Sequence, residues 1–141
     1  MKTLRRSDGD WLSGYQAAKV EVMSRVPTQL KDVKIVHVPH YAVGANFVGR
    51  WVVVLDSLCF FPDEAILGVL AHELAHIHLK ENPQEMRDDE DSHLAADRIA
   101  RDWGFGRDIR AYLRRYEEIR EDLGWPALDR RRLEIAGVTS P

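Results

Sequence analysis

The sequence predicts an α+β domain in which one helix is followed by a small sheet and then by further helices. Two segments predict strands, because residues 33–38 alternate and are rich in β-branched side chains, whereas residues 50–55 form a more continuous apolar run. Helices are predicted where apolar residues recur at spacings of three and four, as in 11–25 and 65–79. A chain of 141 residues has the size of a single domain, so residues 1–141 are expected to fold as one.

Prolines and glycines predict where the first helix and the strands begin and end. The helix over 11–25 should end at Pro27, and the strand over 33–38 at Pro39. Between the two strands, segment 44–49 carries the glycines of a turn or of an irregular edge strand. Together these segments predict a mixed or antiparallel sheet of about three strands.

A helix is expected to begin at the acidic pair that follows Pro62. It should end at Asn82-Pro83. Proline suits a first helical turn, and Asp63 and Glu64 suit the positive end of the helix dipole. Further helices are expected over 90–103, 108–122 and 128–135.

The most informative motif lies on the expected central helix and has the form HExxH, with His72, Glu73 and His76 at its fixed positions. Residues four apart lie one above the other on a helix, so both imidazoles can bind one metal ion. Glu73 lies about 100° around the axis, where it can reach a metal-bound water instead of the metal. The alternative is a pair of packed histidines, but each unpartnered buried polar group costs roughly 1–3 kcal/mol, and a metal would provide partners.

A catalytic zinc site takes a third protein ligand, and the helix expected over 90–103 offers candidates. Glu90, His93 and Asp97 follow at spacings of three and four, which predicts that they share one face. We predict His93 as the third ligand, with Glu90 as its rival and Asp97 hydrogen-bonded to His93 or His72. His78 lies about 200° around the helix from His76 and is expected off the metal face.

Composition narrows the possible partners and compartment. With 45% hydrophobic and 30% charged residues the chain is typical of a soluble globular protein, and its net charge of −3 argues against bulk attraction to nucleic acid or to an anionic membrane. The basic run at 130–132 is interpreted as a helix surface. No apolar run approaches the roughly 20 residues of a membrane span, and the single cysteine, Cys59, suits a reducing compartment. A cytoplasmic protein is expected.

Residues 44–118 resemble the minigluzincin core of the HtpX and CAAX prenyl protease family of zinc endopeptidases. The resemblance rests on the edge segment 44–47, the strand and loop over 50–64, and the helix segment 69–76, which reads VLAHELAH. It also rests on residues 93–100, which read HLAADRIA and match the family pattern ExxADxxA except that His93 replaces the ligand glutamate. Small proteases of the ImmA/IrrE and SprT types are related possibilities.

The resemblance implies a zincin-like fold and a zinc metalloendopeptidase that acts on a protein or peptide substrate. It implies further that the edge segment 45–48 pairs with an extended substrate. From the motif, we expect Zn²⁺ to be held by His72, His76 and His93, and peptide bonds to be hydrolysed by a zinc-activated water with Glu73 as general base. Tyr112, Arg115 and Tyr116 are candidates for stabilising the oxyanion. The alternatives are a non-catalytic zinc-stabilised protein-binding module of phage or bacterial origin and a zinc-free helical domain.

Overall fold

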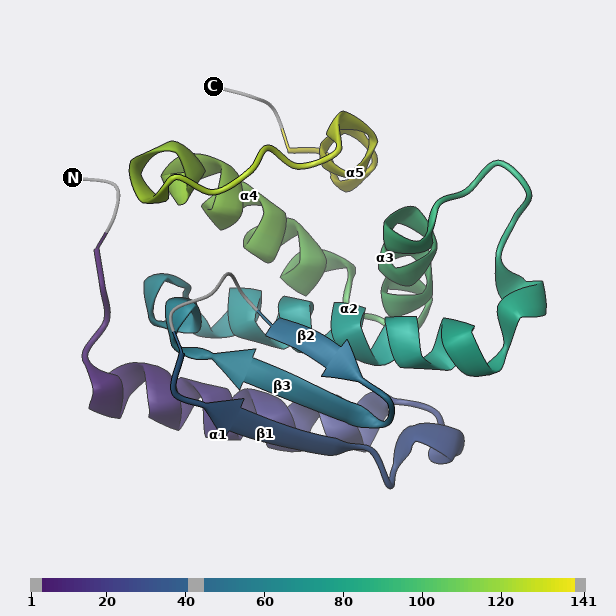
Figure 1. The fold of residues 1–141 in the computed structure, drawn as a ribbon, viewed down its shortest axis with the longest axis horizontal. Coiled ribbons are helices and arrows are strands. Elements are labelled where there is room, and N and C mark those ends of the chain that lie inside the picture. The colour runs from purple at the N-terminus through teal and green to yellow at the C-terminus, as the bar shows by residue number, and fades with distance from the viewer. Residues whose placement is uncertain (1–3, 41–44, 139–141) are drawn as a thin grey trace.

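The computed structural model describes residues 4–40 and 45–138, and over these residues the chain forms five α-helices, three short 3₁₀ segments and one three-stranded sheet (Figure 1). The expected α+β order of helix, sheet and helices is confirmed. The helices and strands are α1 (Asp8–Arg25), β1 (Lys34–Val38), β2 (Ala45–Val48), β3 (Trp51–Leu55), α2 (Asp63–Glu81), α3 (Ser92–Asp102), α4 (Gly106–Leu123) and α5 (Arg130–Ala136).

The sheet is mixed, with the order β1-β3-β2. Strand β3 is parallel to β1, with Val36 opposite Val53, and antiparallel to β2, with Asn46 also opposite Val53. Segment 45–48 is therefore a regular edge strand, while Gly44 lies outside the described residues. Gly49 has a φ of 58° in the turn that joins β2 to β3, a left-handed conformation that glycine adopts without steric cost.

Helix α2 runs through the middle of the molecule, between α1 and the sheet on one side and α3 and α4 on the other (Figure 1). Apolar residues at spacings of three and four predict a single packing face, but the helix is buried on nearly all sides, from Ala65 to Ile77 without interruption. A helix that is apolar all round has to be covered on every side to remove its surface from water. The central position of α2 follows from this composition.

The connection from α2 to α3 contains the 3₁₀ segment Pro83–Glu85 and ends at Asp91, which caps α3. The Asp91 carboxylate accepts a hydrogen bond from the Leu94 backbone N–H at 2.9 Å. Helix α3 therefore begins at Ser92, and Glu90 precedes it. The prediction that Glu90 shares a helical face with His93 and Asp97 is wrong for this reason.

After α4 the chain turns at Gly124, whose φ is 69°, and returns along α4 to form α5, which packs against α4 and α3 (Figure 1). The interpretation of residues 130–132 as a helix surface is wrong for Arg132. Arg130 and Arg131 are exposed, but the next position on the helix faces inward, and only 7% of Arg132 is exposed. Among the described residues, no helix is long and apolar enough to cross a membrane.

The close approach of α2 and α4 gives a first prediction. A Cβ atom at Gly68 would lie 2.1 Å from the backbone oxygen of Asp108 on α4, so Gly68→Ala must push the two helices apart. We expect the free energy of unfolding to fall by about 1–3 kcal/mol, the usual cost of overpacking, in urea denaturation followed by circular dichroism. Gly9→Ala on α1 is the matched control, since a Cβ there meets no atom within 4 Å. Equal stability of the two variants would contradict the close approach.

Candidate metal centre

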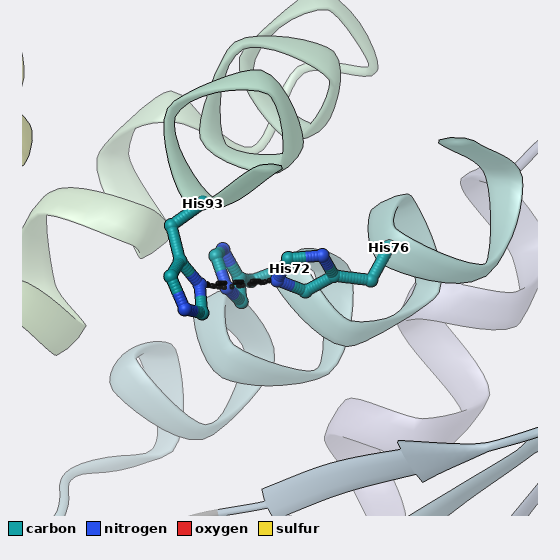
Figure 2. A group of neighbouring side chains, drawn as sticks. All are labelled: His72, His76 and His93. Carbon is teal, nitrogen blue, oxygen red and sulfur yellow. Dashed lines mark hydrogen bonds between the residues drawn. The ribbon is translucent and has the colours of Figure 1, made fainter. Parts of the chain in front are cut away.

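Three histidines from two helices point toward one another (Figure 2). His72 and His76 lie one turn apart on α2 and are buried, with 4% and 7% of their surface exposed. His93 lies in the first turn of α3 and is an exposed residue. The capping of α3 by Asp91 sets the start of that helix and so places His93 opposite the motif helix.

The facing nitrogen atoms of the three rings form a small triangle. His76 Nε2 lies 2.9 Å from His72 Nε2 and 3.2 Å from His93 Nδ1, and the third side of the triangle measures 3.4 Å. Two imidazole nitrogens bound to one tetrahedral ion at about 2.0–2.1 Å lie about 3.3 Å apart. The three histidines are therefore close enough to hold one metal ion, and the triangle has the size of one face of a tetrahedral coordination sphere.

Burial keeps the two motif histidines neutral. It lowers the pKa of His76 to about 3, with further lowering from the neighbouring His72 and His93, and it lowers the pKa of His72 as well. An imidazole binds a metal only in its neutral form, because the cation has no free lone pair. At neutral pH, both rings are in the state that can bind.

A buried carboxylate and a buried arginine stand behind His72. Asp97 Oδ1 lies 2.7 Å from His72 Nδ1, and Arg132 donates to both Asp97 oxygens at 2.7 and 3.1 Å. Burial alone would raise the pKa of Asp97, but the hydrogen bonds from His72 and Arg132 outweigh it and hold the pKa below its usual range. Because an ionised carboxylate only accepts hydrogen bonds, His72 Nδ1 must donate, which leaves the lone pair on the Nε2 that faces the triangle.

Glu73 lies next to the triangle and is only 6% exposed. Its Oε2 is buried and has no hydrogen-bond partner among the residues that the structure describes. Burial raises the pKa of Glu73 to about 8. A buried carboxylate oxygen without a partner is costly, and its position beside three converging imidazoles fits a site that receives a cation and a water.

Glu90, the rival candidate for the third ligand, and His78 both lie away from the histidine triangle. Glu90 accepts hydrogen bonds from Arg98 at 2.9 and 3.0 Å and takes no part in the triangle. His78 is half-buried on the other side of α2, where its Nε2 contacts Glu85 at 2.6 Å. Of the candidates considered, His93 alone joins the two motif histidines.

The three candidate oxyanion stabilisers differ in position. Tyr112 and Tyr116 line the cavity that contains His72 and Glu73, and burial raises the pKa of Tyr112, so its hydroxyl keeps the proton that it could donate. The Tyr116 hydroxyl already donates to the Pro126 carbonyl at 2.8 Å. Arg115 donates to the Phe60 carbonyl and does not line this cavity. Tyr112 is therefore the best placed of the three.

Sequence reasoning missed Arg132. A usable signal was present, because Arg132 is followed by the buried Leu133 and lies four residues before Ala136, so it falls on the apolar side of a short helix. Its partner Asp97 is 35 positions away, and no local pattern links the two.

Two cavities meet at the histidine triangle and share Asn46, Glu73 and His93. One, of about 530 Å³, extends toward Phe47 and Met86, and the other, of about 550 Å³, extends toward Tyr112 and Arg132. Both contain the edge strand β2 in their walls, so the triangle lies in the middle of a cleft that runs past this strand.

The chain matches no model of a known protein family, no curated protein and no solved structure.

The triangle predicts that metal binding depends on His93 and not on Glu90. His93→Ala should weaken zinc binding more than about 100-fold, since loss of a residue that only supports a ligand already costs about 10–100-fold. Glu90→Ala is the matched control on the same segment and should retain the affinity of the unchanged protein. Competition with a chromophoric chelator measures both. If Glu90→Ala loses the metal and His93→Ala keeps it, Glu90 is the ligand.

The buried ion pair predicts a large loss of stability when its cation is removed. Arg132→Met leaves Asp97 ionised and buried without its charge partner, so the free energy of unfolding should fall by about 3–5 kcal/mol. Arg130→Met makes the same change at an exposed position of the same helix and should leave the unfolding curve nearly unchanged. Urea denaturation of metal-free protein measures both, and coinciding curves would show that Arg132 is not needed.

Proposed function

We propose that this protein is a zinc metalloendopeptidase of the minigluzincin type, with zinc held by His72, His76 and His93. The observation that carries the proposal is the triangle of imidazole nitrogens with sides of 2.9, 3.2 and 3.4 Å beside a buried, unpartnered carboxylate oxygen. Three neutral histidines are a common ligand set of catalytic zinc and leave a fourth position for water or substrate. Three imidazoles also suit copper, iron or nickel. We propose zinc among these metals because HExxH is the motif of zinc metalloproteases.

When bound, zinc supplies a Lewis acid that polarises the substrate carbonyl and acidifies the attacking water. A metal cation beside Glu73 would lower the pKa that burial raises, so Glu73 would be ionised and would act as the general base, accepting a proton from that water and passing it to the leaving amine nitrogen. Asp97 and Arg132 hold the His72 ring with its Nε2 lone pair toward the site. Tyr112, whose hydroxyl stays protonated, is placed to donate a hydrogen bond to the developing oxyanion.

The arrangement of elements supports a zincin-like fold. An HExxH helix packs against a mixed sheet, the strand nearest to that helix is a free edge in the described part of the chain, and the third histidine comes from a later helix (Figure 1). The ligand histidine and the aspartate four residues later take the places of glutamate and aspartate in the family pattern. A protein or peptide is the substrate class that this layout favours, since an extended chain can pair with the edge strand.

The decisive variant separates catalysis from metal binding. Glu73→Gln keeps the shape of the side chain but removes its ability to accept a proton, so it should retain one equivalent of zinc and lower cleavage of unfolded casein by about 100- to 10,000-fold. Metal content by mass spectrometry and release of casein peptides measure the two properties.

The matched control is Glu64→Gln, the same change on an exposed residue in the first turn of the same helix. It should leave both properties unchanged. Undiminished cleavage by Glu73→Gln would exclude Glu73 as the base. A zinc-loaded wild-type protein without any peptidase activity would favour the non-catalytic zinc-binding module instead.

A further inference from the structure

The cavity on the Phe47 side of the histidine triangle has apolar walls. Beyond the residues that it shares with the metal centre, it is lined by Phe47, Leu79, Pro83 and Met86, with Asn46, Lys80 and Ser92 as polar residues. We call it the Phe47 cavity. Its volume of about 530 Å³ lies in the usual range of ligand-binding cavities.

Three of its walls are held in place by the fold. The Phe47 ring stacks on the His76 ring, with 5.2 Å between centroids and 16° between planes. Leu79 is buried on α2, and Pro83 begins the 3₁₀ segment after it. Phe47 and Leu79 therefore define the part of the cavity that adjoins the metal centre.

Met86 forms the outer wall and differs from the others. It is 44% exposed, which places it among the exposed large apolar residues of the described chain. An unbranched thioether side chain adapts to apolar groups of different shape. Met86 can therefore close over side chains of different outline without a change in the rest of the cavity.

The edge strand determines what can enter. On β2, Ala45 and Phe47 point to the same face of the sheet, and Ala45 lines the second cavity, toward Tyr112 and Arg132. A chain paired with β2 would also place every second side chain on that face, at intervals of about 7 Å. One side chain of an extended peptide thus reaches the Phe47 cavity, and a side chain two residues away reaches the second, more polar cavity.

We propose that the Phe47 cavity is a specificity subsite for one large apolar side chain, aliphatic or aromatic, such as leucine, methionine or phenylalanine, of an extended peptide that lies along β2. The proposal rests on the proposed peptidase function, whose substrate it narrows to segments with such a residue at the reacting bond. The second cavity, with its arginine and tyrosines, does not impose this requirement.

Peptide binding tests the subsite without relying on cleavage. Fluorescein-labelled decapeptides of serine, threonine and alanine, with leucine, methionine, phenylalanine, glycine or aspartate at one central position, are titrated against zinc-loaded Glu73→Gln by fluorescence anisotropy. Peptides with a large apolar residue should bind about tenfold more tightly than those with glycine or aspartate, because that side chain leaves water. Equal affinity for all five peptides overturns the proposal.

Met86→Glu, in the same Glu73→Gln background, assigns the preference to this cavity. It places a carboxylate on the outer wall and should reduce the preference for leucine over aspartate to less than about threefold, with unchanged zinc content. Val20→Glu makes a similar change at a position that is 73% exposed on α1, away from the cleft, and should retain the full preference. Circular dichroism verifies that both variants are folded. A full preference in Met86→Glu places the apolar subsite elsewhere and overturns the proposal.

Cleavage of the same peptides by the zinc-loaded wild-type protein separates the two proposals. If the peptides bind with the expected preference and none is cleaved, the peptidase function fails and the subsite stands. If leucine and aspartate peptides are cleaved at equal rates, the peptidase function stands and the subsite fails.

Discussion

A continuous chain of hydrogen bonds links three helices at the centre of the molecule. It runs from His72 on α2 through Asp97 on α3 to Arg132 on α5, and all three side chains are buried. A carboxylate at this depth is stable as an anion only because a cation and a ring N–H compensate for its lost hydration. The orientation of His72, and with it the geometry of the triangle, depends on that compensation.

The cost of burying polar groups explains why the centre is organised as it is. Helix α2 is covered on nearly every side, yet it carries two imidazoles and a carboxylate among its apolar residues. The imidazoles meet this cost by remaining neutral and facing a common point, and Glu73 leaves one oxygen unsatisfied toward the same region. Unsatisfied buried polar groups are most often found at functional sites. A cation bound between the three imidazoles would reduce the cost of burying the unpartnered Glu73 oxygen.

The sequence predicted what is encoded locally. The HExxH spacing placed His72 and His76 on one helical face, and the spacing between His93 and Asp97 identified the helix that faces it. Two features could not be read in this way. The start of α3 depends on the cap at Asp91, one residue after Glu90, and a shift this small decides which side chains share a face. Arg132 reaches Asp97 through a contact between residues 35 positions apart, and a helical surface pattern contains no information about such a contact.

The return of the chain over α4 has a consequence for the order in which the molecule acquires its properties. The contact between α5 and α3 joins residues 35 positions apart, and a contact over this distance carries a loop-closure cost that contacts within one helix do not. Until α5 docks, Asp97 lacks its cation and the His72 ring lacks a fixed orientation. The three-histidine centre is therefore fully assembled only in a chain whose α5 has docked.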